Sequence, residues 1–358
     1  SVKQDVETCI KAGVRVVMIT GDNGITASAI ARQIGMADSD KIITGDEIDK
    51  MSQEELKEKI KNVSIFSRVI PEHKMRIVQA FKANGEIVAM TGDGVNDAPA
   101  LKYADIGIAM GKRGSEVARE AADLILLDDN FSTIVDTIKD GRRIYDNIKR
   151  AFGYVIVIHI PIAFAALLAP LLGINPACLL LLPVHVVLLE LVIDPTCSIV
   201  LERQPAETDI MERPPRKMNE KLIDINSLTK SLFQGFAIFG AAFGTYLTFL
   251  EQYPDNAALA RTMGLTIMFI SNMLLVHVNS SESELAIRSI LRLRGDKVIA
   301  AVNIGVILGL IIMLYTPFAD VLKLAPLTWQ EIILAVGIAC ASVLWYEIVK
   351  LVRLGMTK

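Results

Sequence analysis

The loop from Thr91 to Pro99 carries two carboxylates four residues apart, Asp93 and Asp97, in the string TGDGVNDAP. It follows an apolar run at 87–90 that is expected to form a strand. The two glycines of the string allow backbone turns that side chains would obstruct, so both carboxylates can converge beyond the carboxyl end of that strand. Hard oxygen ligands suit Mg²⁺. The alternative is a plain polar turn, but the full string predicts a loop that holds Mg²⁺ beside a phosphate.

Two further segments bring suitable groups to the same edge of the predicted sheet. The apolar strand expected over 14–19 ends in Thr20, Gly21 and Asp22, which supply a hydroxyl, a flexible turn and an acid. The segment 68–74 reads RVIPEHK, and its Lys74 begins a predicted helix. A hydroxyl, an ammonium group and Mg²⁺ together can neutralise a phosphoryl group during transfer. Each residue alone has an ordinary structural explanation, but their joint position at strand ends predicts a phosphoryl-transfer site.

A second set of polar residues lies inside long apolar segments. Glu190 and Asp194 are four residues apart, so they share one face of a helix, and Pro195 frees a backbone carbonyl just beyond them. Polar groups within membrane spans are costly and suggest function, so this acid pair predicts a cation site. His159 and Asn272 are candidate additional ligands; a helix–helix hydrogen bond and a packing amide are their respective alternatives.

The elements that position these residues fall into two parts. In the first part, strands alternate with helices, which indicates a doubly wound α/β domain with a parallel sheet. We expect this domain to cover 1–130 and a stalk helix to cover 131–150. Six apolar segments long enough to span a bilayer follow within 151–350, and a cytoplasmic tail covers 351–358. The expected spans are 151–172, 179–200, 229–250, 259–278, 297–315 and 328–350.

Composition and charge exclude some functions. The 358 residues are 52% hydrophobic, which is high for a soluble protein. The net charge of -3 provides no basic face for nucleic acid, so no nucleic-acid partner is expected. The four cysteines are scattered without paired spacing, as in a reduced protein. Basic residues gather in two of the connections between spans, which places those loops and the α/β domain in the cytoplasm; they are Arg203, Arg213, Arg216, Lys217, Lys221, Arg288, Arg292, Arg294 and Lys297.

These motifs together resemble the C-terminal half of a P-type ATPase. The resemblance covers essentially the whole chain, and TGDGVNDAP is among the most specific strings of that family. It implies a phosphorylation domain of haloacid-dehalogenase-like, Rossmann-like fold, followed by six transmembrane helices. The segment 209–216 is similar to a loop of the type II pumps, the class that contains the calcium pumps. The implied ligands are Mg²⁺, ATP and a transported cation, which we expect to be Ca²⁺ or a similar divalent ion.

The resemblance also implies roles for individual residues. Asp93 would ligand Mg²⁺, Asn96 and Asp97 would organise the site, and Lys74 would neutralise the phosphoryl group. Thr20 and Asp22 would contact the phosphoryl group and its surroundings, and Gly21 and Arg68 belong to the same matching motifs. In the membrane, Asp194 agrees with the calcium-pump pattern, whereas Glu190 stands where that pattern has Asn. This departure, with His159 and Asn272 in place of expected glutamates, leaves open a one-ion site with proton counter-transport.

The family's nucleophile is an Asp in the string DKTGT, which does not occur here. Asp40-Lys41 is a decoy: it matches only the first two letters of that string, because two isoleucines follow it. We interpret Thr44-Gly45 as an ordinary helix cap. We therefore expect a partner segment that carries the actuator domain, the nucleotide-binding domain and four more spans. Two alternatives remain: a membrane-anchored phosphohydrolase of the same fold, and an inactive fragment of a pump. We expect an integral protein of a bacterial plasma membrane in contact with membrane lipid.

Overall fold

The computed structural model describes residues 2–217, 219–282, 284–292 and 296–356. The chain divides into two compact units, and we consider each by itself. The first contains residues 1–142 and 208–217, and the second contains residues 143–207 and 218–358. Arg294, one of the basic residues noted above, and the last two residues of the expected tail lie outside the described residues.

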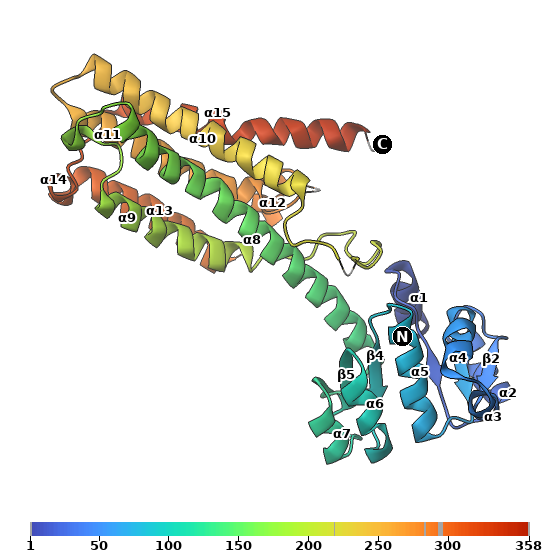
Figure 1. Ribbon diagram of the computed structural model, residues 1–358. Helices are drawn as coiled ribbons and strands as arrows, with labels where there is room; N and C mark the ends of the chain where they lie inside the picture. The colour runs from blue at the N-terminus through green and yellow to red at the C-terminus, as the bar shows by residue number, and fades with distance from the viewer. Residues whose placement is uncertain (1, 218, 283, 293–295, 357–358) are drawn as a thin grey trace. The chain divides into compact units, whose positions relative to one another are not determined.

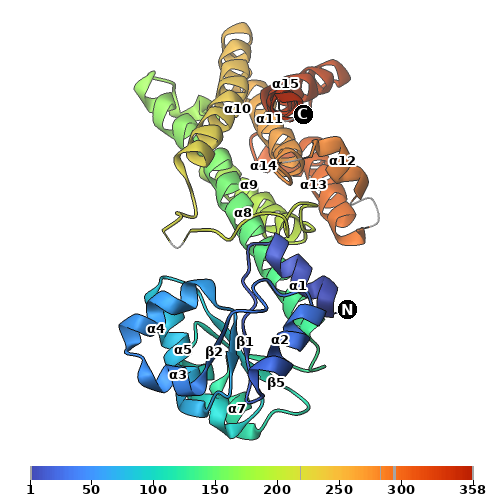
Figure 2. The same ribbon diagram turned by 90° about the vertical axis from the view of Figure 1, so that its right-hand side faces the viewer.

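The first unit contains two three-stranded parallel sheets (Figure 2). One has the order β1-β3-β2 and the other the order β4-β5-β6. Parallel strands need crossover connections, and helices supply them here. The strands are β1 (Met18–Ile19), β2 (Ile42–Thr44), β3 (Ile65–Ser67), β4 (Ala89–Gly92), β5 (Ile106–Met110) and β6 (Leu124–Leu126). The helices are α1 (Val2–Lys11), α2 (Gly24–Gln33), α3 (Gly45–Lys50), α4 (Gln53–Lys59), α5 (Pro71–Ala83), α6 (Ala98–Tyr103) and α7 (Glu116–Ala121).

The middle strand β3 shows why both faces of its sheet carry helices. Successive side chains of a strand point to opposite faces. Ile65 packs in a cluster with residues of α1 and α2, whereas Phe66 packs with residues of α3, α4 and α5. Both side chains are fully buried. The predicted doubly wound arrangement is therefore confirmed, since each face of this sheet has its own apolar core.

Strands β1 and β4 each pair with another strand on one side only. Within the described residues, β1 pairs with β3 and β4 pairs with β5. Ile19 and Val88 nevertheless pack against the apolar clusters of both sheets. The two edge strands are thus connected through side chains, while each leaves a row of backbone hydrogen-bonding groups without a ladder partner.

The helices and strands agree with most of the sequence-based expectations. Thr44 caps α3 in a capping box with Glu47, as the interpretation of that segment predicted. The expected strand at 14–19 is shorter, because only Met18 and Ile19 pair with β3. Strand β2 was not predicted, since its isoleucines follow the decoy Asp40-Lys41 and only the tertiary pairing with β3 makes them a strand.

The segment that follows the second membrane helix packs in the first unit. Arg142 donates hydrogen bonds to the carbonyls of Ile210 and Arg213, each at 2.8 Å, and to the carbonyl of Ala12 at 2.7 Å. Gly13 has a φ of +70°, and a Cβ at that position would lie 2.6 Å from Cδ of Pro215. Close approach and backbone conformation therefore both require glycine at position 13.

The second unit consists of long apolar helices (Figure 1). Among the residues that the structure describes, six helices are long and apolar enough to cross a membrane, as predicted. Helix α8 runs unbroken through the expected stalk and first span, and α9 continues into a π-helix. Helix α11 is buried along most of its length and packs against α10 and α15. The bounds are α8 (Phe131–Leu171), α9 (Pro183–Pro195), the π-helix η4 (Thr196–Leu201), α10 (Ile225–Gln252), α11 (Ala257–Val278), α12 (Ala286–Arg292), α13 (Lys297–Tyr315), α14 (Phe318–Val321) and α15 (Trp329–Met356).

Candidate functional site

The candidate phosphoryl site is organised around an ion pair between Lys74 and Asp97. Nζ of Lys74 lies 2.5 Å from Oδ1 of Asp97. Pro71 at the start of α5 favours helix initiation and places Lys74 in the first turn. Asp97 closes the short 3₁₀ turn that follows β4. The side chains are 24% and 7% exposed, respectively, so Asp97 is a nearly buried carboxylate whose charge is balanced by Lys74.

The second oxygen of Asp97 is also engaged. Oδ2 accepts hydrogen bonds from the backbone N–H groups of Asp93 at 3.2 Å and Gly94 at 3.1 Å. Gly92 lies against the same side chain, because a Cβ there would be 2.6 Å from Cβ of Asp97. Asp97 therefore fixes the conformation of the loop, in agreement with the organising role expected for it.

The carboxylate of Asp93 remains available for a ligand. Asp93 is exposed, and its side chain makes no hydrogen bond or ion pair with any described residue. Its backbone carbonyl accepts a hydrogen bond from the N–H of Ser115 at 2.7 Å, which holds the loop in place. Asn96 is likewise exposed. A fixed loop that presents a free carboxylate oxygen fits Mg²⁺, a cation that binds through one or two carboxylates and otherwise through water and phosphate.

The segment Thr20 to Asp22 lies at the end of β1 and is tied to the end of β3. The N–H of Val69 donates to the carbonyl of Thr20 at 3.1 Å, and the N–H of Arg68 donates to the carbonyl of Asp22 at 3.0 Å. Oγ1 of Thr20 accepts the N–H of Asp22 at 3.1 Å. Arg68 is exposed and has a φ of +52°, a conformation that is uncommon for a residue with a side chain. Among the described residues, no hydrogen bond links Thr20, Gly21 or Asp22 to Lys74 or Asp97.

His73 is a residue near the site to which the sequence assigned no role. The structure buries it. Its Nδ1 accepts the N–H of Ile70 at 3.3 Å, so its Nε2–H donates to Oδ1 of Asp49 at 2.8 Å. His73 thereby fixes the first turn of α5 to α3 and positions its neighbour Lys74. Only its place in the first turn, next to Lys74, could have indicated this role.

In the membrane unit, the structure brings two of the four predicted cation ligands together. Nε2 of His159 on α8 lies 3.2 Å from Oε1 of Glu190 on α9. Nδ1 of His159 lies 2.8 Å from the carbonyl of Val155, so Nδ1 carries a proton. Nε2 of His159 and the carboxylate of Glu190 therefore lie close enough for both to contact one ligand.

The other two predicted ligands do not join this pair. Asp194 is exposed, whereas Asn272 is buried in α11 and its side chain makes no hydrogen bond within the described residues. No group of three or more His, Cys, Asp and Glu side chains that could hold a metal ion occurs in the part of the chain that the structure describes. Pro195 lacks an N–H and is followed by the π-helix, so the helix is locally widened immediately after Asp194.

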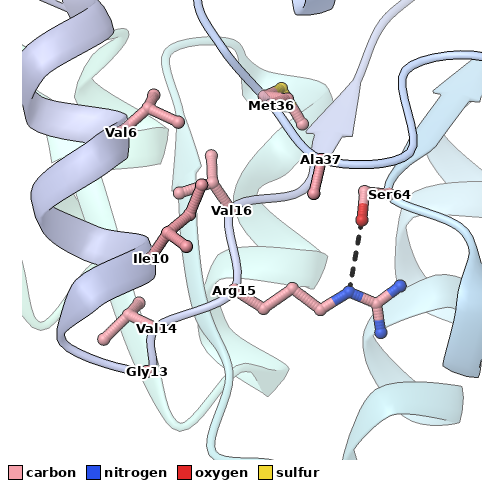
Figure 3. Close-up of a pocket in the computed structure, with 9 residues that line it drawn as sticks. All are labelled: Val6, Ile10, Gly13, Val14, Arg15, Val16, Met36, Ala37 and Ser64. Carbon is pink, nitrogen blue, oxygen red and sulfur yellow. Dashed lines mark hydrogen bonds between the residues drawn. The ribbon is translucent and has the colours of Figure 1, made fainter.

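A hollow of about 260 Å³ lies elsewhere in the first unit, between α1 and the segment that leads into β1 (Figure 3). Arg15 is its main polar group. The guanidinium donates to Oγ of Ser64 and to the carbonyls of Ile60, Lys61 and Val63. These hydrogen bonds explain Arg15 as a structural residue that joins this wall to the turn before β3. The hollow contains none of the predicted site residues.

Comparison with known families agrees with both units. Residues 1–105 and 73–138 each match a family described as haloacid dehalogenase-like hydrolase. Residues 178–352 match the family described as the C-terminus of cation transporting ATPases. The predicted fold class, a haloacid-dehalogenase-like domain followed by six membrane helices, is thereby confirmed.

Individual relatives align along nearly the whole chain. A calcium-transporting ATPase of Bacillus subtilis is 37% identical over 339 residues, which are 94% of this chain and 38% of the relative. Calcium-transporting ATPase 1 of Lactococcus lactis is 36% identical over 96% of this chain and 38% of its own length. Human calcium-transporting ATPase type 2C member 1 is 32% identical over 100% of this chain and 38% of its own length. This multi-pass membrane chain is therefore similar to cation-transporting P-type ATPases, and it spans about two fifths of the length of the relatives it matches.

Proposed function

We propose that this chain forms the C-terminal portion of an ATP-driven cation pump that works through an aspartyl-phosphate. The observation that carries the proposal is the loop in which Asp97 pairs with Lys74 while Asp93 remains free. A charged lysine beside an unengaged carboxylate at the carboxyl end of parallel strands suits a phosphoryl group with its Mg²⁺. The names of the relatives support transport of Ca²⁺ or a similar divalent ion.

In this proposal the chain's own residues prepare the phosphoryl site. Lys74 neutralises the oxygens of the transferred group, Asn96 and Thr20 donate hydrogen bonds to it, and Asp93 ligands Mg²⁺. Bound Mg²⁺ would supply further positive charge at the phosphoryl oxygens. Gly21, Asp22 and Arg68 are exposed and border the phosphoryl site, and ATP would approach the site past them.

The nucleophilic aspartate would come from the segment that the relatives carry beyond the matched region. The unpaired edges of β1 and β4 within the described residues support this origin. A parallel strand inserted between β1 and β4 would complete one continuous sheet, and its carboxyl end would lie between the Thr20 and Asp93 loops. ATP would then transfer its γ-phosphoryl group to that carboxylate, with ADP as the leaving group.

The transported cation would bind at the membrane face formed by α8 and α9. Glu190 and Asp194 supply carboxylates, His159 supplies a ligand or a proton, and Asn272 supplies an amide oxygen. Because His159, Glu190 and Asp194 are all partly or well exposed, this face has room for a further span from the same absent segment. The proximity of His159 to Glu190 is the observation that supports proton counter-transport as part of this proposal.

The proposed setting is a bacterial plasma membrane with the phosphoryl site in the cytoplasm. The gathering of basic residues in the connections after α9 and after α11 supports this orientation. The expected partners are the transported cation, membrane lipid and the segment with the actuator domain, the nucleotide-binding domain and four spans. No role for nucleic acid is proposed.

Phosphoenzyme formation tests the proposal. The chain is supplied with the N-terminal segment of its Bacillus subtilis relative, and labelling from ATP is measured with Ca²⁺, with Mn²⁺, with Mg²⁺ alone and at several pH values. We expect acid-stable labelling that depends on one transported ion and that Asp93→Asn abolishes. Glu190→Gln should shift the ion and pH dependence while it leaves the fold intact.

Two results would contradict the pump. Labelling without ion dependence, together with steady phosphate release, would indicate a membrane-anchored hydrolase. Absence of labelling from a correctly folded complex would indicate an inactive fragment. Lys82→Met is a control for the general effect of removing a lysine from α5, since Lys82 pairs with Asp105 instead of the site.

A further inference from the structure

The short helix α12 presents an apolar face to the surroundings. It connects α11 with α13 and contains seven residues, AIRSILR. Ile287, Ile290 and Leu291 are 65%, 46% and 60% exposed, respectively. Their spacing of three and four residues puts them on one side of the helix. Three large apolar side chains on one face of so short a helix form a surface that water solvates poorly.

One edge of α12, at its first residue, is attached to the helix bundle. Ala286 is buried, and its N–H donates to Oε2 of Glu347 on α15 at 2.7 Å. Lys350, also on α15, donates to the carbonyl of Val278 at the end of α11 at 2.5 Å. The ends of α11 and α15 thus hold α12 in place. The exposed apolar side chains of α12 therefore lie on a helix whose position is fixed by hydrogen bonds.

The position of α12 along the chain places it at a membrane boundary. Helix α11 ends at Val278 and α13 begins at Lys297, and both are long enough to cross a bilayer. Helix α12 lies in the connection between these two helices. Val298, in the first turn of α13, is a further exposed apolar side chain at the end of this connection.

Basic residues border this apolar surface. Arg288 is exposed and forms no ion pair with any described acid. At 3.6 residues per turn, it lies about 100° around the helix from Ile287, at the edge of the apolar face. Lys297 is also exposed. Long basic side chains at such an edge keep their stems on apolar material and their charges among headgroups.

We propose that α12 is an interfacial helix that binds anionic phospholipid. Ile287, Ile290 and Leu291 enter the boundary between headgroups and acyl chains, and Arg288 and Lys297 contact the anionic headgroups. The position of α12 in the connection between two membrane helices selects the membrane as the occupant of its apolar face, and the basic residues at the edge of that face select anionic lipid. The inference requires only that the six spans lie in a bilayer, so it is independent of the pump activity proposed above.

Tryptophan quenching by brominated lipids tests this inference in the full chain. Ile290→Trp is reconstituted into phosphatidylcholine vesicles that contain phosphatidylglycerol, with bromine on the acyl chains of one lipid or the other. The unsubstituted chain supplies the background from Trp329 and Trp345. We expect stronger quenching by brominated phosphatidylglycerol, because each basic residue near the surface enriches anionic lipid by about fivefold. Adding Arg288→Gln should remove most of that preference.

Two matched variants serve as controls. Ile25→Trp places a tryptophan on α2 of the first unit, where Ile25 is 86% exposed, and it should not be quenched. Lys102→Gln removes one positive charge on α6 and should leave the lipid preference of Ile290→Trp unchanged. Equal quenching by the two brominated lipids would overturn the preference for anionic headgroups. No quenching by either would overturn the contact with the membrane and leave a protein segment as the occupant.

Discussion

The ammonium group of Lys74 and the carboxylate of Asp97 are 2.5 Å apart, although the residues are 23 positions apart in the chain. This contact joins the start of α5 to the turn after β4. It leaves the neighbouring carboxylate of Asp93 free, so one acid of the loop has a structural role and the other can bind a ligand. The contact between Lys74 and Asp97 is thus the reason that the two aspartates have different roles.

Lys74→Met should both destabilise the first unit and impair phosphoryl transfer. Without the ammonium group, Asp97 is a nearly buried charge with no oppositely charged partner, at a cost of about 3 kcal/mol in the free energy of unfolding. Loss of a positive charge from the site should slow phosphoenzyme formation by about 10²- to 10³-fold. Thermal unfolding and rapid-quench labelling measure the two effects. Lys82→Met, which breaks a partly exposed ion pair, should cost at most about 1 kcal/mol and leave labelling unchanged.

Gly92→Ala should disturb the site, whereas Gly94→Ala should be tolerated. A Cβ at position 92 would lie 2.6 Å from Cβ of Asp97, but the nearest atom to a Cβ at position 94 is 3.6 Å away. Overpacking of this kind costs about 1–3 kcal/mol, and here it displaces the carboxylate that fixes the loop. The stabilisation of the chain by added Mg²⁺ in thermal unfolding should weaken for Gly92→Ala only. Equal behaviour of the two variants would contradict the proposed packing.

Helix α10 offers a second matched pair of glycines. Gly235 packs against α8, where a Cβ would lie 2.5 Å from Cδ1 of Ile160 and 2.9 Å from the carbonyl of Val157. That carbonyl has no helical donor, because the residue four positions later is Pro161. Gly235→Ala should therefore lower stability in detergent by about 1–3 kcal/mol. A Cβ at Gly240 meets no atom within 4 Å, so Gly240→Ala should be neutral. A destabilised Gly240→Ala with an unaffected Gly235→Ala would refute this account of the α8–α10 contact.

The attachment of segment 208–217 should depend on pH. Arg213 donates to both carboxylate oxygens of Asp209, at 2.5 and 2.8 Å, and this hydrogen bonding lowers the pKa of Asp209. The pair therefore stabilises the folded segment fully above the ordinary pKa of about 3.9, and the contribution is lost as pH falls through the lower folded value. Both side chains are more than a third exposed, so the contribution is at most about 1 kcal/mol.

Amide hydrogen exchange within 208–217, corrected for intrinsic rates, measures this effect. Asp209→Asn should exchange up to about fivefold faster than the native chain near pH 6, and the difference should decrease steadily as the pH falls below the ordinary pKa of about 3.9. The exposed Asp46 on α3 provides the control Asp46→Asn, which should leave the segment unchanged. A difference that did not decrease in acid would show that the carboxylate charge is not the cause.

The sequence by itself determined the fold class, the six spans and the loops that carry the candidate site. These features depend on local patterns: apolar runs of strand or membrane length, glycines at turns, and capping residues such as Thr44. The carboxyl ends of parallel strands share one edge, so the sequence predicts that the Thr20 and Asp93 loops form a common site, which remains a prediction.

Only the tertiary structure decided which side chains meet. Strand β2 exists because its isoleucines pair with β3, and His73 is buried because α3 lies against the start of α5. The pairing of His159 with Glu190 requires α8 and α9 to face each other at the right rotation, whereas Asp194, one turn further along α9, stays exposed. Sequence spacing fixes the face of one helix, but the rotation and depth of its neighbour come from the packing of the whole bundle.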